Sequence, residues 1–568
     1  MTTDKVAIQL IALRCAENGI RHVVLSPGSR SAPLVIAFSN QKDFTTSVIA
    51  DERVAGYFAL GMAQQLQAPV AVICTSGTAV LNLAPAICEA YYQNLPLLAI
   101  TADRPAGAHL QGENQAILQQ DIFRNYIGIS ATMDGEEATN ENLSHIEKIV
   151  ENSFSILQNP NALPVHWNVH LQEPLYGKAD SPARFKSFPI TTVVEPQKEF
   201  QDVTELQNQW NSSAKKLVIL GMRPNINEHD VALEKLSQRD DVVIWKESTS
   251  NFYGASSAVS NVDACLAYID DEEASKFIPD IIITLGRQIV SKRAKSFLKK
   301  YRPVHFDIAP GSNHARNWDM FGSLQKNQLP YQELKVLKLL AESGTVASSF
   351  HLLWQQLSKQ ISARHEAFLS AAPYCDLKVF ETLIDSYPAG ANIQYGNSSP
   401  VRYSNLFDHK NEVTVNANRG TSGIDGCVST AAGAAYVSQK LTINIVGDVS
   451  FIYDSNALWN KQLSEHLRII VINNGGGNIF RLIEGPASVT HFEDFFETCH
   501  TVDASHLASM YGLPYYICSC EAELKQMLPQ FYQPQGGKAA IMEIKTDGAL
   551  SAAIFKNYFS QLKRKGIE

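Results

Sequence analysis

Residues 442–450 read TINIVGDVS, and residues 469–477 read IIVINNGGG. In each stretch an apolar, β-branched run leads directly into a short polar cluster, GDVS at 447–450 and NNGGG at 473–477. Runs of this kind are typical of buried parallel strands, whose carboxyl ends bind ligands in open α/β sheets. The two stretches therefore predict neighbouring strands, with a candidate ligand site where both strands end.

Oxygen ligands dominate these two clusters. Asp448 offers a carboxylate, Asn474 offers an amide oxygen, and the glycines let the backbone approach a ligand closely. Together they suit a hard cation such as Mg²⁺ held against a diphosphate. Gly-Asp and Asn-Asn-Gly are also ordinary turn sequences, so these residues alone support a simple pair of turns equally well.

The amino-terminal third repeats the strand–turn plan. Between about residues 5 and 185, four apolar runs are each followed by a polar turn; the runs lie at 23–25, 47–50, 70–74 and 97–100, and the turns at 26–31, 51–53, 75–78 and 101–105. Helix-like stretches between them predict a doubly wound parallel sheet with right-handed crossovers. The polar turns are then expected along one edge of that sheet.

Two further α/β regions follow. The second has apolar runs at 217–221, 242–245, 281–286 and 304–307, and the third has an amphipathic stretch at 350–368 and runs at 392–395, 442–446, 469–472 and 539–544. Irregular connectors lie near 190–200 and 310–345. We therefore predict an α/β protein with three doubly wound domains, at residues 1–185, 190–345 and 346–568.

Composition narrows the class of protein. The 568 residues are 45% apolar and 18% charged, and the net charge of −9 argues against nucleic-acid partners and membrane surfaces. No run reaches the ~18 apolar residues of a membrane span, and the start of the sequence lacks a signal-peptide pattern. The nine cysteines are scattered and odd in number, so we expect free thiols in a reducing cytoplasm.

Spacing connects the opening clusters to a known signature. One helix-length crossover separates them, as in the Gly-Asp … Asn-Asn motif of thiamine diphosphate enzymes, although Val449 stands where a glycine is usual. Further turns occur in order: SPGSRS at 26–31, DER at 51–53, TSGTAVLN at 75–82, TADRP at 101–105, GENQ at 112–115 and NRGTSGIDG at 418–426. With them the chain resembles the 2-succinyl-5-enolpyruvyl-6-hydroxy-3-cyclohexene-1-carboxylate synthase family along essentially its whole length. That family commonly lacks the glycine that Val449 replaces.

The resemblance implies fold and activity together. The fold would comprise a pyrimidine-binding, a central and a diphosphate-binding domain of the thiamine diphosphate enzyme type. The protein would be a transferase of menaquinone biosynthesis that uses thiamine diphosphate with Mg²⁺, or Mn²⁺ in its place. The implied reaction is decarboxylation of 2-oxoglutarate and 1,4-addition of the succinyl carbanion to isochorismate, with release of CO₂. The middle third has no GxGxxG fingerprint, so neither FAD nor NAD is assigned to it.

Glu52 carries the catalytic role in this interpretation. A carboxylate at the pyrimidine N1′ promotes loss of the C2 proton of the cofactor, and Glu52 matches the family's glutamate. By itself an acidic residue after a strand is more ordinarily a helix start stabilised by the helix dipole. The resemblance makes Asp448, Asn474 and the Gly476 carbonyl the metal ligands and Ile424 an apolar wedge under the cofactor. The whole implied cofactor set is Glu52, Gly77, Ile424, Asp448, Ser450, Asn474, Gly476 and Ile479.

The implied substrates each carry two carboxylates, which planar arginine side chains bind in bidentate fashion. Any single arginine is more often a surface ion-pair residue, but several at predicted strand ends of an acidic chain favour a substrate site. The candidate set is Ser29, Arg30, Arg104, Asn114, Gln115, Lys292, Arg293, Ser398, Arg402, Arg419 and Phe480. Of these we expect Ser398, Arg402 and Arg419 near 2-oxoglutarate, and Arg30, Arg104, Gln115 and Arg293 near isochorismate.

Assembly and rival functions complete the expectations. In the family, the glutamate and diphosphate walls of one site come from different subunits, which implies a homodimer or homotetramer, without nucleic acid and without stable membrane insertion. The nearest rival is another thiamine diphosphate-dependent decarboxylase or carboligase, such as an acetolactate-synthase-like enzyme, against which the arginine-rich turns argue. A non-catalytic nucleotide-binding α/β protein is the other rival, and it has no need of Glu52.

Overall fold

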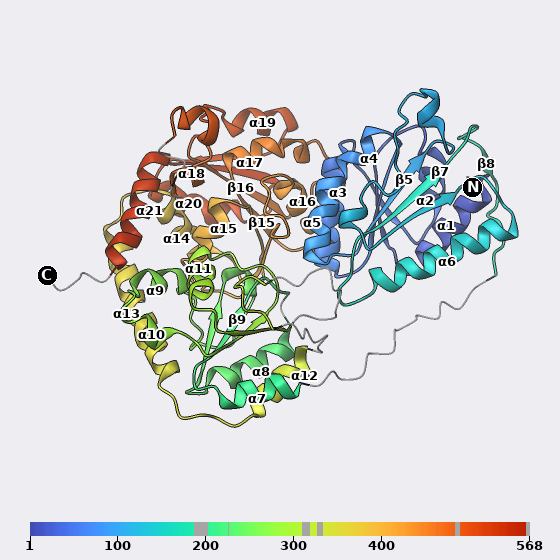
Figure 1. Cartoon of the computed structure of the whole chain (residues 1–568). Coiled ribbons are helices and arrows are strands. Elements are labelled where there is room, and N and C mark those ends of the chain that lie inside the picture. The colour runs from blue at the N-terminus through green and yellow to red at the C-terminus, as the bar shows by residue number, and fades with distance from the viewer. Residues whose placement is uncertain are drawn as a thin grey trace.

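The computed structural model of the chain describes residues 1–186, 203–224, 226–308, 319–325, 333–482, 485 and 489–563. Three units, each built around one parallel sheet, are visible in Figure 1, with the first unit on the right and the other two on the left. The connector predicted near 190–200 lies outside the described residues. The connector predicted at 310–345 contains a helix, α12 (Glu333–Glu342), in its described part.

The first unit contains a six-stranded parallel sheet in the order β3-β2-β4-β5-β7-β6. Its strands are β2 (His22–Leu25), β3 (Thr45–Val48), β4 (Val70–Cys74), β5 (Leu97–Asp103), β6 (Ile129–Asp134) and β7 (Val165–His170). Its helices are α1 (Val6–Glu17), α2 (Ala32–Asn40), α3 (Glu52–Leu66), α4 (Thr78–Asn82), α5 (Ala84–Gln93) and α6 (Asn140–Leu157). A short antiparallel pair, β1 (Thr2–Thr3) and β8 (Lys178–Ala179), lies beside them.

The central unit has a four-stranded parallel sheet in the order β10-β9-β11-β12. Its strands are β9 (Lys216–Leu220), β10 (Val242–Lys246), β11 (Ile281–Leu285) and β12 (Val304–Ile308). Its other helices besides α12 are α7 (Thr204–Ser212), α8 (Asn227–Ser237), α9 (Val262–Tyr268), α10 (Ala274–Phe277) and α11 (Lys292–Tyr301). All four strands fall where the apolar runs predict them.

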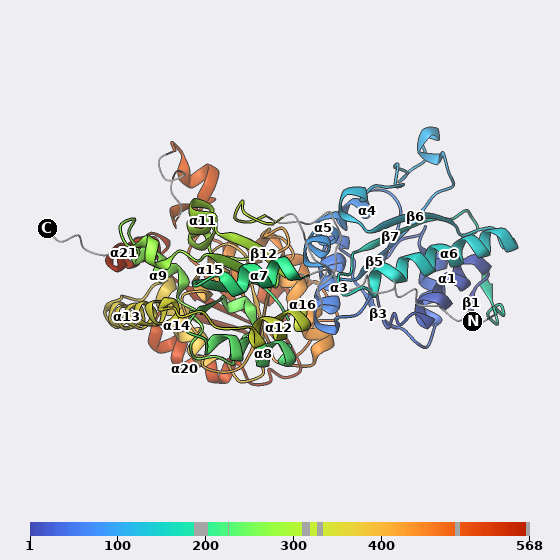
Figure 2. The ribbon, with the colours of Figure 1, turned by 60° about the horizontal axis from the view of Figure 1, so that its bottom comes forward.

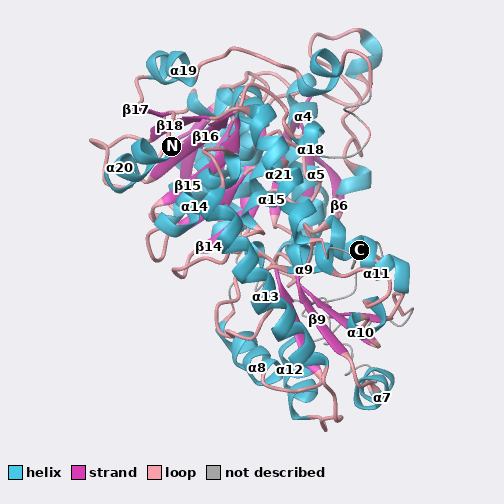
Figure 3. Cartoon of the chain, turned by 90° about the vertical axis from the view of Figure 1, so that its left-hand side faces the viewer, coloured by secondary structure: helices cyan, strands magenta, loops and turns pink. Residues whose placement is uncertain are grey.

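The third unit has a six-stranded parallel sheet in the order β14-β13-β15-β16-β18-β17. Its strands are β13 (Asn392–Tyr395), β14 (Thr414–Ala417), β15 (Thr442–Gly447), β16 (Leu467–Asn473), β17 (Tyr515–Cys518) and β18 (Ala540–Lys545). Its helices are α13 (Phe350–Ala371), α14 (Asp376–Ser386), α15 (Ser399–Ser404), α16 (Cys427–Ser438), α17 (Asp448–Tyr453), α18 (Ile479–Leu482), α19 (Ala504–Tyr511), α20 (Glu521–Phe531) and α21 (Gly548–Leu562). Figure 3 shows this sheet and that of the central unit in separate parts of the molecule.

The three-domain α/β fold class is confirmed, with corrections to individual strands. β15 and β16 are parallel neighbours, as the opening stretches predict. The predicted run 47–50 forms its strand two residues earlier, because Ile49–Asp51 already lead into the start of α3. The turn predicted at 101–105 begins only after Asp103, since Thr101–Asp103 continue β5 and pair with β7. Strands β6, β7, β14 and β17 were not predicted.

Buried side chains join the units rather than stopping at their borders. One apolar cluster packs α3 and α5 of the first unit against α16 of the third, with Val54, Phe58, Val428 and Ala431 among its fully buried members. Another runs from the central sheet through α13 into the third sheet. The first unit is therefore fixed to the third through α3, as Figures 1 and 2 both show.

Helices α3 and α16 cross at two glycines. A Cβ placed on Gly61 would lie 2.0 Å from the carbonyl oxygen of Thr430, and a Cβ on Gly433 would lie 2.0 Å from that of Phe58. Real Cβ atoms do not approach backbone oxygens so closely, so any side chain at either position would push the helices apart. The pair of glycines thus sets the distance between the first and third units.

Within the described residues, no helix combines the length and apolar character that crossing a membrane would require.

Alanine at Gly433 tests this crossing. We expect Gly433→Ala to lower the free energy of unfolding by about 1–3 kcal/mol, because the added methyl group overpacks a contact between two backbones. Urea titration followed by circular dichroism measures the change. Gly344→Ala is the matched control, since a Cβ at Gly344 meets no atom within 4 Å. Equal stability of the two variants would contradict the crossing as described.

Candidate active site

The two opening clusters form one nest at the carboxyl ends of β15 and β16. Asp448 is the first residue of α17 and is only 3% exposed. Its Oδ2 accepts hydrogen bonds from the backbone N–H groups of Asn474, Gly475 and Gly476, at 3.1, 2.9 and 3.0 Å. Its Oδ1 accepts one from the N–H of Val449 at 2.7 Å. The carboxylate of the first cluster is thus held inside the backbone turn of the second.

Burial raises the pKa of Asp448, and the backbone donors together with nearby His500 oppose that rise. His500 Nε2 lies 3.4 Å from Asp448 Oδ2. Gly475 makes the tight turn possible, because its φ of +85° is a left-handed conformation that favours glycine. A buried carboxylate ringed by fixed dipoles at a sheet edge is a suitable ligand for a divalent cation.

The two asparagines of the turn have different surroundings. Asn473 is fully engaged in the scaffold: its Nδ2 donates to Glu543 and to the Val502 carbonyl, and its Oδ1 accepts from the Gly475 N–H at 3.2 Å. Asn474 is therefore the amide of the pair that can offer an oxygen to a cation. The described residues contain no cluster of three His, Cys, Asp or Glu side chains suited to a metal. The predicted ligand set of one carboxylate, one amide and one carbonyl is instead of the oxygen-rich kind that suits Mg²⁺.

Glu52 lies on the other side of the candidate site, at the start of α3. We call this side the Glu52 wall, and the turn that holds Asp448 the Asp448 wall. Glu52 is the first residue of α3, after the N-cap Asp51, whose Oδ1 accepts the N–H groups of Arg53 and Val54. Burial raises the pKa of the half-buried Glu52 carboxyl, and the neighbouring Asp51 adds to the rise. A carboxyl with a raised pKa is suited to sharing a proton with a ring nitrogen.

The start of α3 docks on the segment that begins with Asp448. Asn456 Nδ2 donates to Asp51 Oδ2 at 2.8 Å, and Arg53 Nη2 donates to the carbonyl of Tyr453 at 2.9 Å. The Arg53 guanidinium also lies 4.8 Å from the centroid of the Tyr453 ring. These contacts bring the Glu52 wall to the Asp448 wall within a single chain.

The loop 418–426 lies between the two walls and is held from both sides. Glu89 of α5 accepts the backbone N–H groups of Gly420 and Thr421, each at 2.6 Å. Tyr57 of α3 donates to Asp425 Oδ2 at 2.6 Å, and Ser450 Oγ donates to the Ile424 carbonyl at 2.5 Å. Ile424 itself remains 36% exposed. The predicted wedge and Ser450 thus belong to one connected loop.

Gly77 has a backbone that a side chain would disturb. Its φ is +83°, and a Cβ there would lie 3.1 Å from the carbonyl oxygen of Gln115. Its N–H donates to Gln119 Oε1 at 2.8 Å, and Gln119 Nε2 donates in turn to Asn168 Oδ1 at 2.9 Å. The buried Gln119 therefore connects the predicted cofactor turn at Gly77 to the segment that carries Asn114 and Gln115, both of which are exposed.

Arg30 and Arg104 form a first basic group. Burial lowers the pKa of Arg30, and the charge of nearby Arg104 lowers it further. Arg30 Nη2 lies 3.5 Å from Glu173 Oε1, and Arg104 Nη1 lies 3.2 Å from Glu113 Oε2. Ser29, beside Arg30, is exposed. Two like charges held as neighbours are suited to a dianionic ligand.

Arg402 and Arg419 form a second basic group, at the border of the central and third units. Burial lowers the pKa of both, and each lies near the carboxyl of Glu247. Burial raises the pKa of Glu247 to about 7, although it accepts the N–H groups of Val290 and Ser291 at 2.7 Å each. Glu247 thereby fixes the segment that leads into α11.

Arg293 is linked to this second group through Asp263, whose carboxyl interacts with both Arg293 and Arg402. The Arg293 guanidinium also lies 4.3 Å from the centroid of the Phe559 ring. Ser398 precedes α15 with a φ of +72°, and Lys292 begins α11 at the exposed surface. The described interactions thus group Arg293 with Arg402, whereas the sequence predicts Arg293 near isochorismate with Arg30 and Arg104.

Ile479 and Phe480 open α18, directly after the glycine turn. The Phe480 ring lies 6.0 Å from that of Phe496, and the Gly477 N–H donates to the Glu497 carbonyl at 2.6 Å. The 493–497 segment therefore packs against the Phe480 ring and holds the turn that precedes α18. Ile479 and Phe480 are both partly exposed, as an apolar wall of a site requires.

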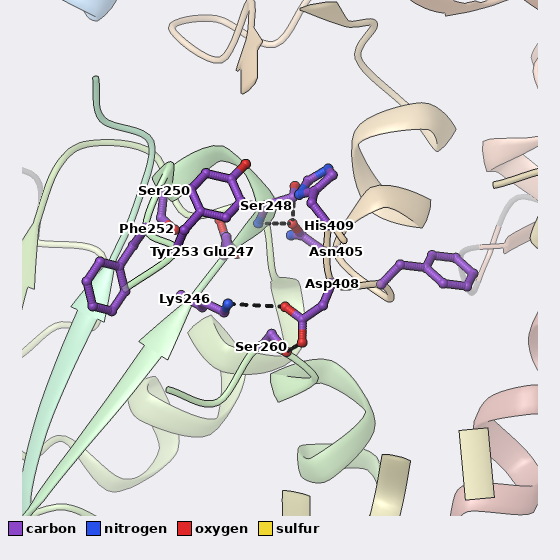
Figure 4. Close-up of a pocket in the computed structure, with 11 residues that line it drawn as sticks. Lys246, Glu247, Ser248, Ser250, Phe252, Tyr253, Ser260, Asn405, Asp408 and His409 are labelled. Carbon is purple, nitrogen blue, oxygen red and sulfur yellow. Dashed lines mark hydrogen bonds and ion pairs between the residues drawn. The ribbon is translucent and has the colours of Figure 1, made fainter. Parts of the chain in front are cut away.

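A polar pocket lies elsewhere, between β10 and the segment after α15 (Figure 4). Lys246 Nζ lies 3.2 Å from Asp408 Oδ1, Ser260 Oγ donates to Asp408 Oδ2 at 2.6 Å, and the Ser248 N–H donates to Asn405 Oδ1 at 3.0 Å. None of the expected site residues is among those that line it. Its bonds join the central and third units behind α15, which carries Arg402.

Several residues that organise the site were not predicted from sequence. They are Glu89, Gln119, Tyr57, Asp425, Glu247 and Asp263. Glu89 offered one signal, because it is a lone charge in the otherwise apolar and aromatic helix APAICEAYYQ. Asp425 lies in the motif at 418–426, which marks the turn but not the role of this side chain. The remaining four have partners far away in the sequence, and no local pattern marks them.

Comparison with known families identifies the first unit. Residues 6–123 match the family described as "Thiamine pyrophosphate enzyme, N-terminal TPP binding domain". The matched range includes Glu52, Gly77 and both members of the first basic group.

Full-length relatives share one name. The chain is 38% identical to a 2-succinyl-5-enolpyruvyl-6-hydroxy-3-cyclohexene-1-carboxylate synthase of Flavobacterium psychrophilum, over 96% of this chain and 97% of the relative. It is 38% identical to the synthase of Flavobacterium johnsoniae over 99% and 100% of the two chains, and 36% identical to that of Christiangramia forsetii over 98% and 99%.

The Glu89 contacts yield a prediction about the loop 418–426. Glu89→Gln leaves one acceptor oxygen where two now serve Gly420 and Thr421, and hydrogen bonds to a charged group are worth about 1.5–3 kcal/mol. We expect a fall in unfolding free energy of about that size and faster hydrogen exchange at the amides of Gly420 and Thr421. Glu137→Gln, on an exposed side chain, is the control. Unchanged exchange at both amides would show that Glu89 does not hold the loop.

Proposed function

The chain belongs to the 2-succinyl-5-enolpyruvyl-6-hydroxy-3-cyclohexene-1-carboxylate synthase family, and we propose that its two facing walls carry out this synthase reaction with the residues described above. The enzyme is a thiamine diphosphate-dependent transferase of menaquinone biosynthesis. Its reaction decarboxylates 2-oxoglutarate and adds the succinyl unit to isochorismate. The division into a pyrimidine-binding domain at 1–185, a central domain at 190–345 and a diphosphate-binding domain at 346–568 is part of the proposal.

One observation supports this assignment above the others. The helix that begins with Glu52 is docked, through Asp51 and Arg53, on the segment that begins with Asp448. A thiamine diphosphate site needs a carboxyl group at the pyrimidine and an oxygen-rich cation site at the diphosphate. Glu52 and the turn around Asp448 offer groups of both kinds, on two walls that the loop 418–426 connects, which supports the proposal.

The residues then divide the work. Bound thiamine diphosphate supplies the electron sink for decarboxylation of a 2-oxoacid. Asp448, Asn474 and the Gly476 carbonyl hold Mg²⁺, or Mn²⁺, against the diphosphate, with Ser450 and Gly77 beside the cofactor. Glu52 holds a proton at the pyrimidine N1′, and Ile424, together with Ile479, gives the cofactor an apolar support.

Two basic groups fit two dicarboxylate substrates. We propose that Arg402 and Arg419, with Ser398 beside them, bind 2-oxoglutarate. Arg30 and Arg104, with Ser29, Asn114 and Gln115 nearby, bind isochorismate. Arg293, Lys292 and Phe480 lie toward the border of the two substrates in this assignment. Acetolactate-synthase-like enzymes act on small substrates with fewer charges, so the two arginine groups favour the synthase over that alternative.

The activity test measures isochorismate consumption that depends on 2-oxoglutarate, thiamine diphosphate and Mg²⁺ together. We expect turnover only when all three are present. Turnover of pyruvate with no acceptor specificity would favour the carboligase alternative, and absence of any turnover in the loaded protein would refute the proposal.

Substitution of Glu52 tests its role in cofactor activation. Glu52→Gln keeps the size of the side chain but removes the group that exchanges a proton, so we expect kcat to fall by about 10²–10⁴-fold. Circular dichroism and cofactor binding should remain close to wild type. Glu141→Gln, at an exposed position in the first turn of α6, is the control for losing a carboxylate at a helix start. Full activity in Glu52→Gln would contradict the proposed role of Glu52 in cofactor activation.

We propose in addition that the protein works as a homodimer, or as a homotetramer of two such dimers. Within the single chain described here, both walls already meet. Exchange of the first domain between two copies would preserve every contact between α3 and α16 and would divide each site between subunits, as in the family. The shared-site arrangement and the single-chain arrangement make opposite predictions for mixed variants.

Mixing of two strongly impaired variants separates these arrangements. Glu52→Gln and Asp448→Asn are each expected to retain at most about 1% of wild-type activity alone. If subunits share sites, one of the two sites in a mixed dimer is intact, and co-expression at equal amounts should restore about a quarter of wild-type activity. If each chain forms its own site, every site carries one substitution and no activity returns. Sedimentation measures the oligomer in the same samples.

A further inference from the structure

A buried carboxylate, Asp376, lies against the turn that carries the proposed metal ligands. It is the first residue of α14 and is 0% exposed. Its Oδ2 accepts a hydrogen bond from Asn474 Nδ2 at 2.9 Å, and its Oδ1 accepts one from Thr546 Oγ1 at 2.6 Å. Its own N–H donates to Ser551 Oγ at 3.0 Å. No step of the proposed reaction uses this carboxylate.

The contact decides which way the Asn474 amide faces. A carboxylate only accepts hydrogen bonds, so the end of the amide that meets Asp376 must be the NH₂ group. Rotation of the amide by half a turn would place two oxygens against each other in a buried site, which is costly. The Asn474 carbonyl oxygen is therefore turned away from Asp376.

Neighbouring Asn473 is also anchored by a hydrogen bond from its NH₂ group to a buried carboxylate, but its side-chain oxygen is differently placed. The carboxylate is that of Glu543, and the side-chain carbonyl oxygen of Asn473 is occupied by the Gly475 N–H. Among the described residues, no hydrogen bond is made to the side-chain amide oxygen, Oδ1, of Asn474. Both amides are anchored through nitrogen, and of the two side-chain oxygens only that of Asn474 accepts no hydrogen bond in the part of the chain that the structure describes.

Asp376 is itself held in place by several elements. Thr546 follows β18, its hydroxyl donates to Asp376, and its N–H donates to the carbonyl of Asn473 at 3.1 Å. Ser551 lies in the first turns of α21. The start of α14, an eleven-residue helix, favours a negative charge at this position. The carboxylate therefore has little freedom to follow Asn474 if the amide rotates.

We propose that Asp376 is a positioning residue for the metal site, which fixes the Asn474 amide so that its oxygen faces the cation. This inference rests on the proposed Mg²⁺ site at Asp448, Asn474 and Gly476. Hydrogen-bond partners behind metal ligands typically contribute about 10–100-fold to metal affinity. Asp376 fulfils this role for an amide ligand and also adds a negative charge behind the site.

The test measures metal affinity rather than turnover. Mn²⁺ binding in the presence of thiamine diphosphate is followed by electron paramagnetic resonance, and the Mg²⁺ dependence of cofactor binding is followed by circular dichroism. In Asp376→Asn, the new amide can donate as well as accept, so Asn474 is free to rotate. We expect the Kd for Mn²⁺ and Mg²⁺ to rise about 10–100-fold. High Mg²⁺ should restore most of the lost activity, because the chemistry itself does not use Asp376.

Glu543→Gln is the matched control. It neutralises the buried carboxylate behind the adjacent asparagine, so it should lower the thermal stability of the cofactor-free protein about as much as Asp376→Asn. Its metal Kd should stay within about threefold of wild type, because Asn473 is no ligand. Equal weakening of metal binding in both variants would assign a general structural role to Asp376 and overturn the proposal.

A double-mutant cycle tests whether Asp376 affects metal affinity through Asn474. If Asp376 acts through Asn474, then Asp376→Asn should not weaken metal binding further in an Asn474→Ser background. Additive losses would contradict the proposal. If Asp376→Asn does not fold, Thr546→Val is used in both measurements instead. We expect a smaller rise in its Kd for the metal. An unchanged Kd in folded Thr546→Val would also contradict the proposal. Wild-type protein that bound thiamine diphosphate without any divalent metal would contradict the proposed metal site instead.

Discussion

The crossing of α3 and α16 is the contact on which the arrangement of the site depends. Gly61 and Gly433 let the two helices approach until backbone meets backbone. α3 begins with Glu52, and α16 follows the loop that carries Ile424, so the closeness at the crossing sets the separation of the two walls. Apolar burial around the crossing supplies the free energy, while the glycines supply the geometry. Neither wall can shift along the other without opening this contact.

Carboxylates that accept backbone N–H groups fix the conformation of the loops around the site. Glu89 holds the loop 418–426, Glu247 holds the segment before α11, and Asp448 holds the turn after β16, each by accepting backbone N–H groups. A carboxylate without partners would be costly to bury, but one that satisfies several backbone donors fixes a loop that has no regular structure of its own. The sheets place the loops at the right edge, and these anions give the loops one conformation.

Sequence patterns predicted most of the strands that are continuous apolar runs and missed several strands of mixed composition. Residues 70–74 form β4 as expected, because this buried parallel strand is a continuous apolar run. β6 and β14 are partly exposed edge strands of mixed composition, and β7 contains two histidines and an asparagine, so none of them gives such a run. The site could be anticipated where a residue follows a predicted strand, as with Asp448. Glu89 lies 331 residues from its partner Gly420 and could not be found by any local pattern.

Charge placement explains how an acidic chain presents basic sites, and it distinguishes the two arginine groups. The partners of Arg30 and Arg104 are Glu173 and Glu113, whose side chains are 75% and 50% exposed, so water screens these pairs and either glutamate can swing away. Glu247, beside Arg402 and Arg419, is fixed by two backbone N–H groups and stays when a ligand arrives. A dianion therefore meets nearly the full charge of Arg30 and Arg104, whereas the second group is already partly neutralised. Arg30 and Arg104 therefore contribute mainly to the affinity for the ligand. Arg402 and Arg419, whose partner is fixed, mainly hold the ligand in a single orientation.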